Sequence, residues 1–151
     1  MELAGVDARA GVISARLVFA PGEPLRTCEI PGLPSAAVAA LPGLRGHRCD
    51  NGAGLTFADE LADTELAHLV EHAALEIMAM AGGAASLRGE TAWDFAQDGP
   101  GVFRLRISYE DETLARGALE AAAELVGALA RGESPPDAEA AARRLREARR
   151  R

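Results

Sequence analysis

The segment 59–81 constrains the fold most, because its apolar residues recur with the period of an α-helix. Asp59 or Asp63 is suited to cap its first turn, and Gly82 with Gly83 supplies a left-handed end. One arc of the helical wheel carries the apolar residues expected to face a core, namely Leu66, Leu69, Ala73, Ile77 and Met80. The sequence therefore predicts a long amphipathic helix that needs an apolar layer to pack against.

A second long helix is expected over 112–131, ending at Gly132. Strand patterns occupy 12–20, 86–93 and 102–110, and a short helix is expected over 34–41. This succession predicts a single α+β domain, in which two long helices pack on one face of a mostly antiparallel sheet. We expect the domain to span residues 1–133 and residues 134–151 to form a polar, arginine-rich tail or helix.

The composition is that of a globular protein and excludes several classes. The chain has 151 residues, of which 48% are apolar and 26% charged. It carries neither a phosphate-binding glycine motif nor an apolar run of about 18 residues, so we expect no nucleotide-dependent chemistry and no membrane partner. The first twenty residues lack the apolar stretch of a secretory signal, and only Cys28 and Cys49 are present. We therefore expect a cytoplasmic protein with reduced thiols.

The charge is distributed unevenly along the chain. The last nine residues hold six arginines and one glutamate, which gives them a local charge of +5. Since the net charge of the chain is −7, the other residues carry −12. An acidic body favours a cationic ligand over nucleic acid. A frayed, solvated terminus is the preferred interpretation of the basic C-terminal end.

The sequence His68-Leu69-Val70-Glu71-His72 carries the chemistry that the rest of the chain lacks. Residues four apart lie one helical turn apart, so His68 and His72 can hold one zinc ion from a rigid helix. Glu71 lies close enough to orient water at the metal and to take its proton. This H-x-x-E-H spacing is the inverted form of the zinc-hydrolase pattern. The competing interpretation is a solvated polar stripe, and two of only three histidines at ligand spacing favour the metal.

A third ligand must come from outside this helix. Glu76 lies about 12 Å beyond His68 along the axis, so it is better suited to fix the tautomer of an imidazole. The external candidates are Cys49, His47, Glu90 and Asp94. A zinc-binding thiolate and a small core residue are equally compatible with Cys49, which leaves the third ligand open between Cys49 and Glu90.

These residues lie within a longer run that resembles a known family. The run AHLVEHAALEIMAMAGG is preceded by LPGLRGHRCD and followed by LRGET and GPGVFRLRISYEDE. In this order it resembles the N-terminal domain of cyanophycin synthetase, over roughly residues 30–131. In that family the domain precedes an ATP-grasp ligase domain and a Mur-ligase-like domain. The chain shows neither pattern, so we do not expect it to synthesise polymer.

The resemblance implies a fold that binds the Asp/Arg polymer and, in some members, a zinc-metallopeptidase-like site that cuts it. Carried onto this chain, it implies His68 and His72 as ligands and Glu71 as the base. The family's His-x-Cys matches His47 and Cys49. His47 is expected to support a metal ligand and not to bind the metal itself. Its TRET-like turn matches a segment containing Arg88, Glu90 and Thr91.

Two functions from different classes follow. The preferred one is a stand-alone zinc-dependent metallopeptidase or amidohydrolase, in which Arg88 stabilises the oxyanion or binds a substrate carboxylate. Its substrate would be a cyanophycin-like or other Arg-containing peptide. The alternative is a non-catalytic module that binds a polymer or a partner, and a closed, structural metal site is a third possibility. The natural substrate and the oligomeric state, including a homo-oligomer, are left open.

Overall fold

The computed structural model describes residues 1–50 and 52–150 and contains a four-stranded antiparallel sheet. The strands are β1 (Glu2–Arg9), β2 (Val12–Val18), β3 (Gly89–Trp93) and β4 (Val102–Ser108). They lie in the order β1-β2-β4-β3, and every neighbouring pair is antiparallel. The expected strands at 12–20, 86–93 and 102–110 are present as β2, β3 and β4. Strand β1 was not predicted, because its small and charged residues lack the apolar alternation of a half-buried strand.

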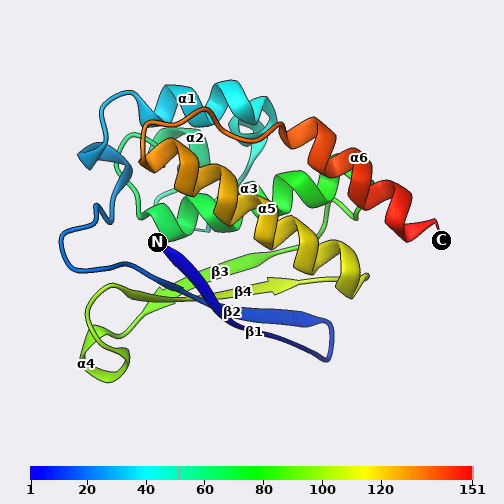
Figure 1. Ribbon diagram of the computed structural model, residues 1–151, viewed down its shortest axis with the longest axis horizontal. Coiled ribbons are helices and arrows are strands. Elements are labelled where there is room, and N and C mark those ends of the chain that lie inside the picture. Colours follow the sequence, from blue (N-terminus) through cyan, green and yellow to red (C-terminus); the bar gives the residue numbers. More distant parts are fainter. Residues whose placement is uncertain (51, 151) are drawn as a thin grey trace.

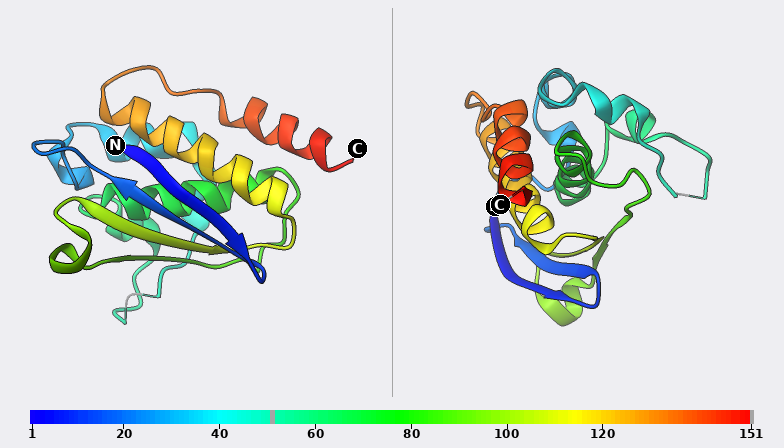
Figure 2. Two further views of the ribbon diagram at one scale, coloured as in Figure 1. Left: turned by 60° about the horizontal axis from the view of Figure 1, so that its bottom comes forward. Right: turned by 90° about the vertical axis from the view of Figure 1, so that its right-hand side faces the viewer.

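Apart from the short helix α4, the helices gather on one side of the sheet, as Figures 1 and 2 show. They are α1 (Leu33–Ala40), α2 (Phe57–Glu60), α3 (Leu66–Met80), α4 (Phe95–Asp98), α5 (Glu112–Ala130) and α6 (Ala138–Arg149), with 3-10 turns η1 (Thr27–Glu29) and η2 (Pro42–Gly46). Helices α3 and α5 pack side by side against the strands. The predicted α+β architecture is confirmed. Within the described residues, no helix has the length and apolar character needed to cross a membrane.

The helix predicted over 59–81 is shorter than expected, and this prediction was wrong at its N-terminal end. Thr56 and Asp59 form a capping box that starts the separate helix α2. The chain then leaves the helical path, because Thr64 exchanges hydrogen bonds with Thr27 across the fold. Helix α3 starts only at Leu66, and neither expected aspartate caps it. Its C-terminal end is as predicted, with Gly82 in the left-handed conformation.

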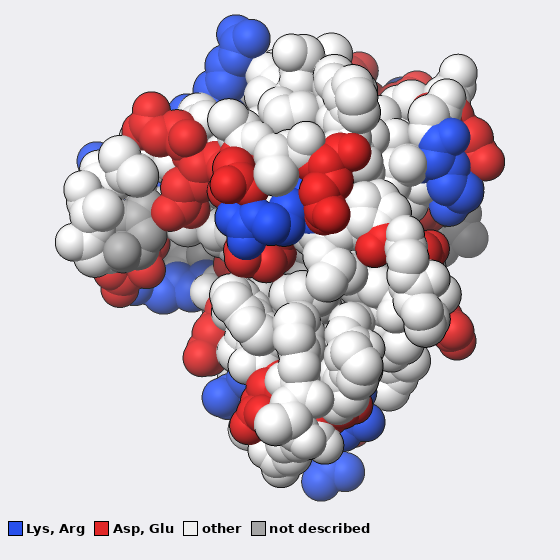
Figure 3. All heavy atoms as spheres, turned by 90° about the vertical axis from the view of Figure 1, so that its left-hand side faces the viewer, with Lys and Arg blue, Asp and Glu red and all other residues white. Residues whose placement is uncertain are grey.

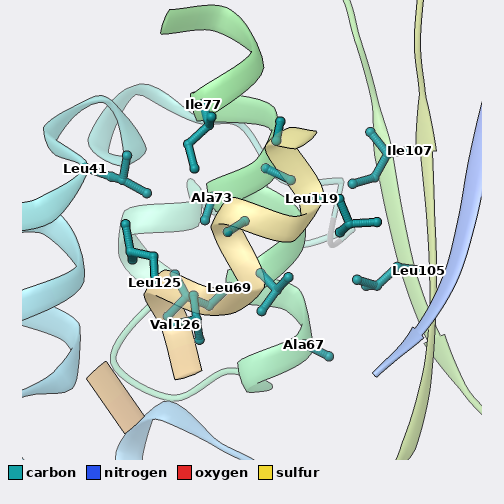
Figure 4. Close-up of a cluster of buried hydrophobic side chains, with 14 of the residues drawn as sticks. Leu41, Ala67, Leu69, Ala73, Ile77, Leu105, Ile107, Leu119, Leu125 and Val126 are labelled. Carbon is teal, nitrogen blue, oxygen red and sulfur yellow. The ribbon is translucent and has the colours of Figure 1, made fainter. Parts of the chain in front are cut away.

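The core lies between the sheet and the two long helices and extends under α1. Leu69, Ala73 and Ile77 of α3 belong to it, which places the predicted apolar arc inward. Figure 4 shows Leu105 and Ile107 pointing from β4 toward α5. Alanines along α3 and α5 allow the two helices to approach closely. Helix α3 is thereby fixed between α5 and the sheet, and its remaining face is available for a site.

The C-terminal segment is a helix that packs on the domain, in contrast to the frayed end expected from its charge. Ala138 and Ala142 of α6 are buried in the core cluster. The guanidinium group of Arg146 donates to the carbonyl of Met80, and that of Arg149 donates to the carbonyl of Gly82 at 2.9 Å. These bonds satisfy carbonyl groups at the C-terminal end of α3, where positive charge is favourable.

Candidate metal centre

Cys49, His68 and His72 converge on one point of the structure. The Nε2 atoms of the two histidines lie 3.1 Å apart. The Sγ atom of Cys49 lies 3.2 Å from Nε2 of His68 and 3.6 Å from Nε2 of His72. These three ligand atoms form a compact triangle, the arrangement needed to hold one metal ion. The geometry therefore brings Cys49, rather than Glu90, against the histidine pair.

Two separate segments supply the three groups. His68 and His72 lie one turn apart on α3, on the side of the helix that contacts Phe57. Cys49 follows η2, in a segment held by an isolated bridge between Arg48 and Thr56. The ring of Phe57 stacks on the imidazole of His72, with centroids 3.8 Å apart and planes 13° apart. The aromatic ring therefore fixes the plane of one ligand.

A chain of hydrogen bonds leads from His72 to a carboxylate. Nδ1 of His72 lies 2.9 Å from Nδ1 of His47, and Nε2 of His47 lies 2.7 Å from Oε2 of Glu76. If Nε2 of His72 faces a metal, its Nδ1–H donates to His47, which in turn donates its Nε2–H to Glu76. Gly43 makes room for this carboxylate, since a Cβ atom there would overlap it. Glu76 thus acts on the ligand through His47.

His68 is held by a different partner. Its Nδ1 lies 2.9 Å from Oγ1 of Thr64, which donates to the Glu65 carboxylate at 3.3 Å. The guanidinium of Arg26 pairs with the same residue, Glu65, at 2.5 Å. Thr64 was missed by sequence reasoning, because it stands before the first turn of α3 and carries no ligand spacing of its own. The Thr64 hydroxyl fixes His68 so that its Nε2 points into the cluster.

Glu71 lies on the same groove and is almost completely buried, with 4% of its surface exposed. The hydroxyl group of Thr91 donates to its Oε2 at 2.5 Å. A Cβ atom on Gly89 would overlap the carboxyl group, so the glycine makes room for it. Burial raises the pKa of Glu71 to about 7, although the bond from Thr91 acts in the opposite direction. A carboxyl group with this pKa can both accept and return a proton near neutral pH.

The electrostatics of the cluster favour neutral ligands in the absence of a metal. Burial, with the nearby His68 and His47, lowers the pKa of His72 to about 3. Burial also lowers the pKa of His68. For Cys49, burial and the neighbouring Glu60 carboxylate raise the pKa to about 12. The imidazole lone pairs are therefore free to bind a cation, and the thiol loses its proton only when a cation replaces it.

The cluster lies in a groove of about 1310 Å³. One side is formed by residues 43–50, another by residues 84–91 together with Trp93, and α3 contributes groups between them. Glu90 borders the groove, but its carboxyl group points to the opposite face of β3; six other acidic residues and three arginines are among the described residues that line the groove. Figure 3 shows acidic side chains around a smaller basic cluster on one face of the molecule. The groove is therefore suited to a cationic ligand.

The other predicted site residues lie apart from the cluster. Glu90 is exposed on the opposite face of β3 and faces Arg106 at 4.0 Å, because side chains alternate along a strand. Asp94 caps α4 through the amide of Gln97. Arg88 is exposed and lines the groove.

Comparison with known proteins places the chain in a family. The sequence family described as the cyanophycin synthase-like N-terminal domain matches residues 16–131 of the chain. The chain is also 38% identical over 112 residues to the cyanophycin synthetases of Trichormus variabilis and a Nostoc species. These matches cover 71% of this chain but only 12% of each relative, so the chain spans about an eighth of their length. The chain belongs to the family of cyanophycin synthase-like N-terminal domains.

Proposed function

We propose that the protein is a zinc-dependent peptidase or amidohydrolase, with Cys49, His68 and His72 as ligands and Glu71 as the proton-transfer group. The observation that carries this proposal is that three metal-binding atoms and a buried carboxyl group share one groove. Nitrogen and sulfur ligands of this kind are those that zinc prefers. A catalytic zinc site takes three protein ligands and leaves a position open, whereas a structural site is closed by four.

The spacing of the ligand atoms agrees with zinc. Zn–N bonds of about 2.0–2.1 Å and Zn–S bonds of about 2.3 Å, at tetrahedral angles, require about 3.3 Å between nitrogens and about 3.5 Å between nitrogen and sulfur. The observed separations are 3.1 Å between the histidine nitrogens, and 3.2 and 3.6 Å to the sulfur of Cys49. The three side chains therefore need little movement to bind the ion.

The residues of the chain account for the proton transfers of amide hydrolysis. Zinc, when bound, supplies Lewis-acid activation of water and of the scissile carbonyl. Glu71 accepts a proton from water as the oxygen attacks the carbonyl carbon, and it returns a proton to the nitrogen as the C–N bond breaks. Thr91 holds the carboxyl group through its hydroxyl, and Arg88 is available to bind a substrate carboxylate or the developing negative charge.

The acidic groove supports an arginine-containing substrate. Its carboxyl groups outnumber its guanidinium groups, and Arg26 is already paired with Asp63 and Glu65. The relatives are named cyanophycin synthetases, so peptides of aspartate and arginine are the first substrates to examine. A cytoplasmic location is part of the same proposal, since a reduced Cys49 is needed as a ligand.

The second candidate function is a binding module without catalysis. It is favoured by the acidic lining of the groove, which can hold a cationic peptide without any chemistry. Such a module would hold the same cationic peptide in the acidic groove but would need neither zinc nor Glu71.

Glu71→Gln separates the two functions. The purified protein and this variant are loaded with zinc, analysed for metal content and incubated with β-Asp-Arg oligomers and Arg-Ala peptides, with cleavage followed by mass spectrometry. We expect the variant to bind zinc fully and to lose about 10²- to 10⁴-fold in turnover. Glu124→Gln, an exposed position on α5, is the matched control. Equal cleavage by both proteins excludes Glu71 as the base, and binding without cleavage by either supports the module.

A further inference from the structure

Strand β3 lies at an edge of the sheet and also borders the groove. The strand order β1-β2-β4-β3 gives β3 a neighbouring strand on one side only. Gly89, Thr91 and Trp93 line the same groove as His68 and Glu71. An unpaired strand edge thus lies beside the groups proposed for catalysis.

The hydrogen-bond pattern shows which main-chain groups of β3 face its neighbour. The amide of Ser108 in β4 donates to the carbonyl of Arg88 at 2.8 Å, and the amide of Arg88 donates to the hydroxyl of Ser108, so the main-chain groups of Arg88 face β4. In an antiparallel ladder, hydrogen-bonded pairs alternate with pairs whose main-chain groups face away from each other. Continuing along the register, Glu90 and Ala92 direct their main-chain groups toward β4.

The remaining three residues of β3 direct their main-chain groups away from the sheet. These are Gly89, Thr91 and Trp93. Across residues 1–50 and 52–150, no main-chain hydrogen bond from a turn, loop or cap reaches their amide or carbonyl groups, and no strand pairs with this edge. They present a regular row of donors and acceptors, the arrangement to which an extended peptide can add as a strand.

Two of these three residues, Gly89 and Thr91, contact the proton-transfer group. The carboxyl group of Glu71 occupies the space beside Gly89 and accepts a hydrogen bond from the hydroxyl group of Thr91. A peptide paired with the outward groups of β3 would therefore pass next to this carboxyl group. The indole of Trp93 is 48% exposed at the end of the strand, where it can contact such a peptide.

The other edge of the sheet is not built in this way. Strand β1 contains a register shift between Ala4 and Asp7, and Asp7 and Arg9 form an ion pair on it. Irregular pairing and charges of this kind protect an edge from added strands. The register of β3 is continuous from Gly89 to Trp93.

We infer that the outer edge of β3 binds the extended main chain of a basic peptide substrate as an added strand. This inference rests on the proposed function, because it concerns the substrate of the same site. The groove volume of about 1310 Å³ exceeds the roughly 300–1,000 Å³ of small-molecule pockets, which agrees with a peptide. Main-chain pairing fixes the position of the peptide, and the acidic lining selects arginine side chains.

Amide hydrogen exchange measured by NMR tests the inference directly. The zinc-loaded Glu71→Gln variant is examined alone and with saturating acetyl-(Ala-Arg)₅-amide. Exchange at Gly89, Thr91 and Trp93 should slow by about tenfold or more, because their amides gain partners. Glu90 and Ala92 serve as internal references, since their amides already face β4.

A pair of substitutions at one position provides an independent test. Trp93→Pro removes the indole and the outward N–H group, whereas Trp93→Ala removes the indole alone. Circular dichroism verifies that both variants fold. We expect Trp93→Pro to bind the peptide more weakly than Trp93→Ala, and equal affinities would contradict main-chain pairing at this residue.

The outcomes distinguish this inference from the proposed function. Peptide binding or wild-type cleavage with unchanged exchange at the three outward amides overturns the edge site and leaves the proposed function standing. Slowed exchange without cleavage by the wild type supports the edge site and overturns the proposed function. The three amides could already exchange slowly without peptide, and more slowly at higher protein concentration. This result would show that the edge pairs with a second copy of the chain, and it overturns the inference. No binding and no cleavage overturns both.

Discussion

Gly89 of β3 lies where the carboxyl group of Glu71 meets the strand, and any side chain at this position would occupy the space of that carboxyl group. The glycine is therefore part of the geometry that fixes Glu71 relative to the metal-binding groups. Its backbone does not require glycine, because its φ is outside the left-handed region. The reason for glycine here is space.

Gly89→Ala is predicted to reduce hydrolysis by about 10- to 100-fold, because displacement of a catalytic group by about 1 Å has an effect of this size. Zinc content should stay unchanged, since the three ligands do not contact Gly89. Gly46→Ala is the matched control, because Gly46 also lines the groove and a Cβ atom there meets nothing within 4 Å. Steady-state kinetics and metal analysis measure both variants, and wild-type turnover in Gly89→Ala would contradict this role.

Cys49→Ser is predicted to weaken zinc binding strongly, because the hydroxyl group that replaces the thiol is a poorer ligand for zinc. Cys28→Ser should bind zinc as the wild type does, since Cys28 is exposed and lies outside the cluster. Competition with a chromophoric chelator measures the two affinities. An unchanged affinity in Cys49→Ser would remove it from the ligand set.

Glu76→Gln is predicted to weaken zinc binding by about 10- to 100-fold, although Glu76 does not belong to the metal-binding cluster. The amide is a weaker acceptor for His47, which then supports the imidazole of His72 less well. Because Cys49 and both ligand histidines remain, the loss should be smaller than in Cys49→Ser. The same chelator competition tests this ranking.

The metal-free protein is predicted to lose stability between about pH 4.5 and 7 through Glu71. The pKa of this group is raised from 4.5 to about 7 in the folded state, so the folded protein binds the proton more tightly than the unfolded chain does. The stabilisation of the folded state by the protonated Glu71 is complete below pH 4.5 and is lost as the pH rises through 7. The size of the loss is about 3 kcal/mol.

Glu71→Gln serves as the reference in this experiment, because it removes the titration and keeps the shape of the side chain. Urea unfolding of both proteins at pH 5 and pH 8 gives the free energies, and the contribution of His72 cancels in their difference. We expect the free energy of unfolding of the variant to increase relative to that of the wild type as the pH rises. A difference that is independent of pH would show that Glu71 does not titrate in this range.

The sequence was sufficient to predict the fold class, because the apolar period of α3 and α5 and the strand patterns of β2 and β4 are strong local signals. It could not place the start of α3. Segment 59–65 has helical composition, yet Thr27 and Arg26 hold Thr64 and Glu65 in an extended path across the fold. Contacts between residues this far apart in the chain leave no local pattern.

The candidate site divides in the same way. His68, Glu71 and His72 could be proposed from helical spacing alone, since one element carries all three. Thr64, Thr91 and the space beside Gly89 depend on how β3 and the start of α3 approach one another, which only the structure shows. Glu90 seemed as good a ligand as Cys49 until the alternation of β3 placed it on the opposite face of the sheet.

The ligands come from two segments, and this division gives an ion between them a mechanical role. Cys49 belongs to the 43–50 side of the groove, whereas the histidines belong to the rigid helix α3. An ion bound by all three would tie a surface segment to the core as a removable cross-link, closing a loop of about twenty residues. Removal of the ion by a chelator would then release the 43–50 side of the groove at the same time as it stops the proposed hydrolysis. The shape of the groove and its reactivity would thus respond together to the supply of metal.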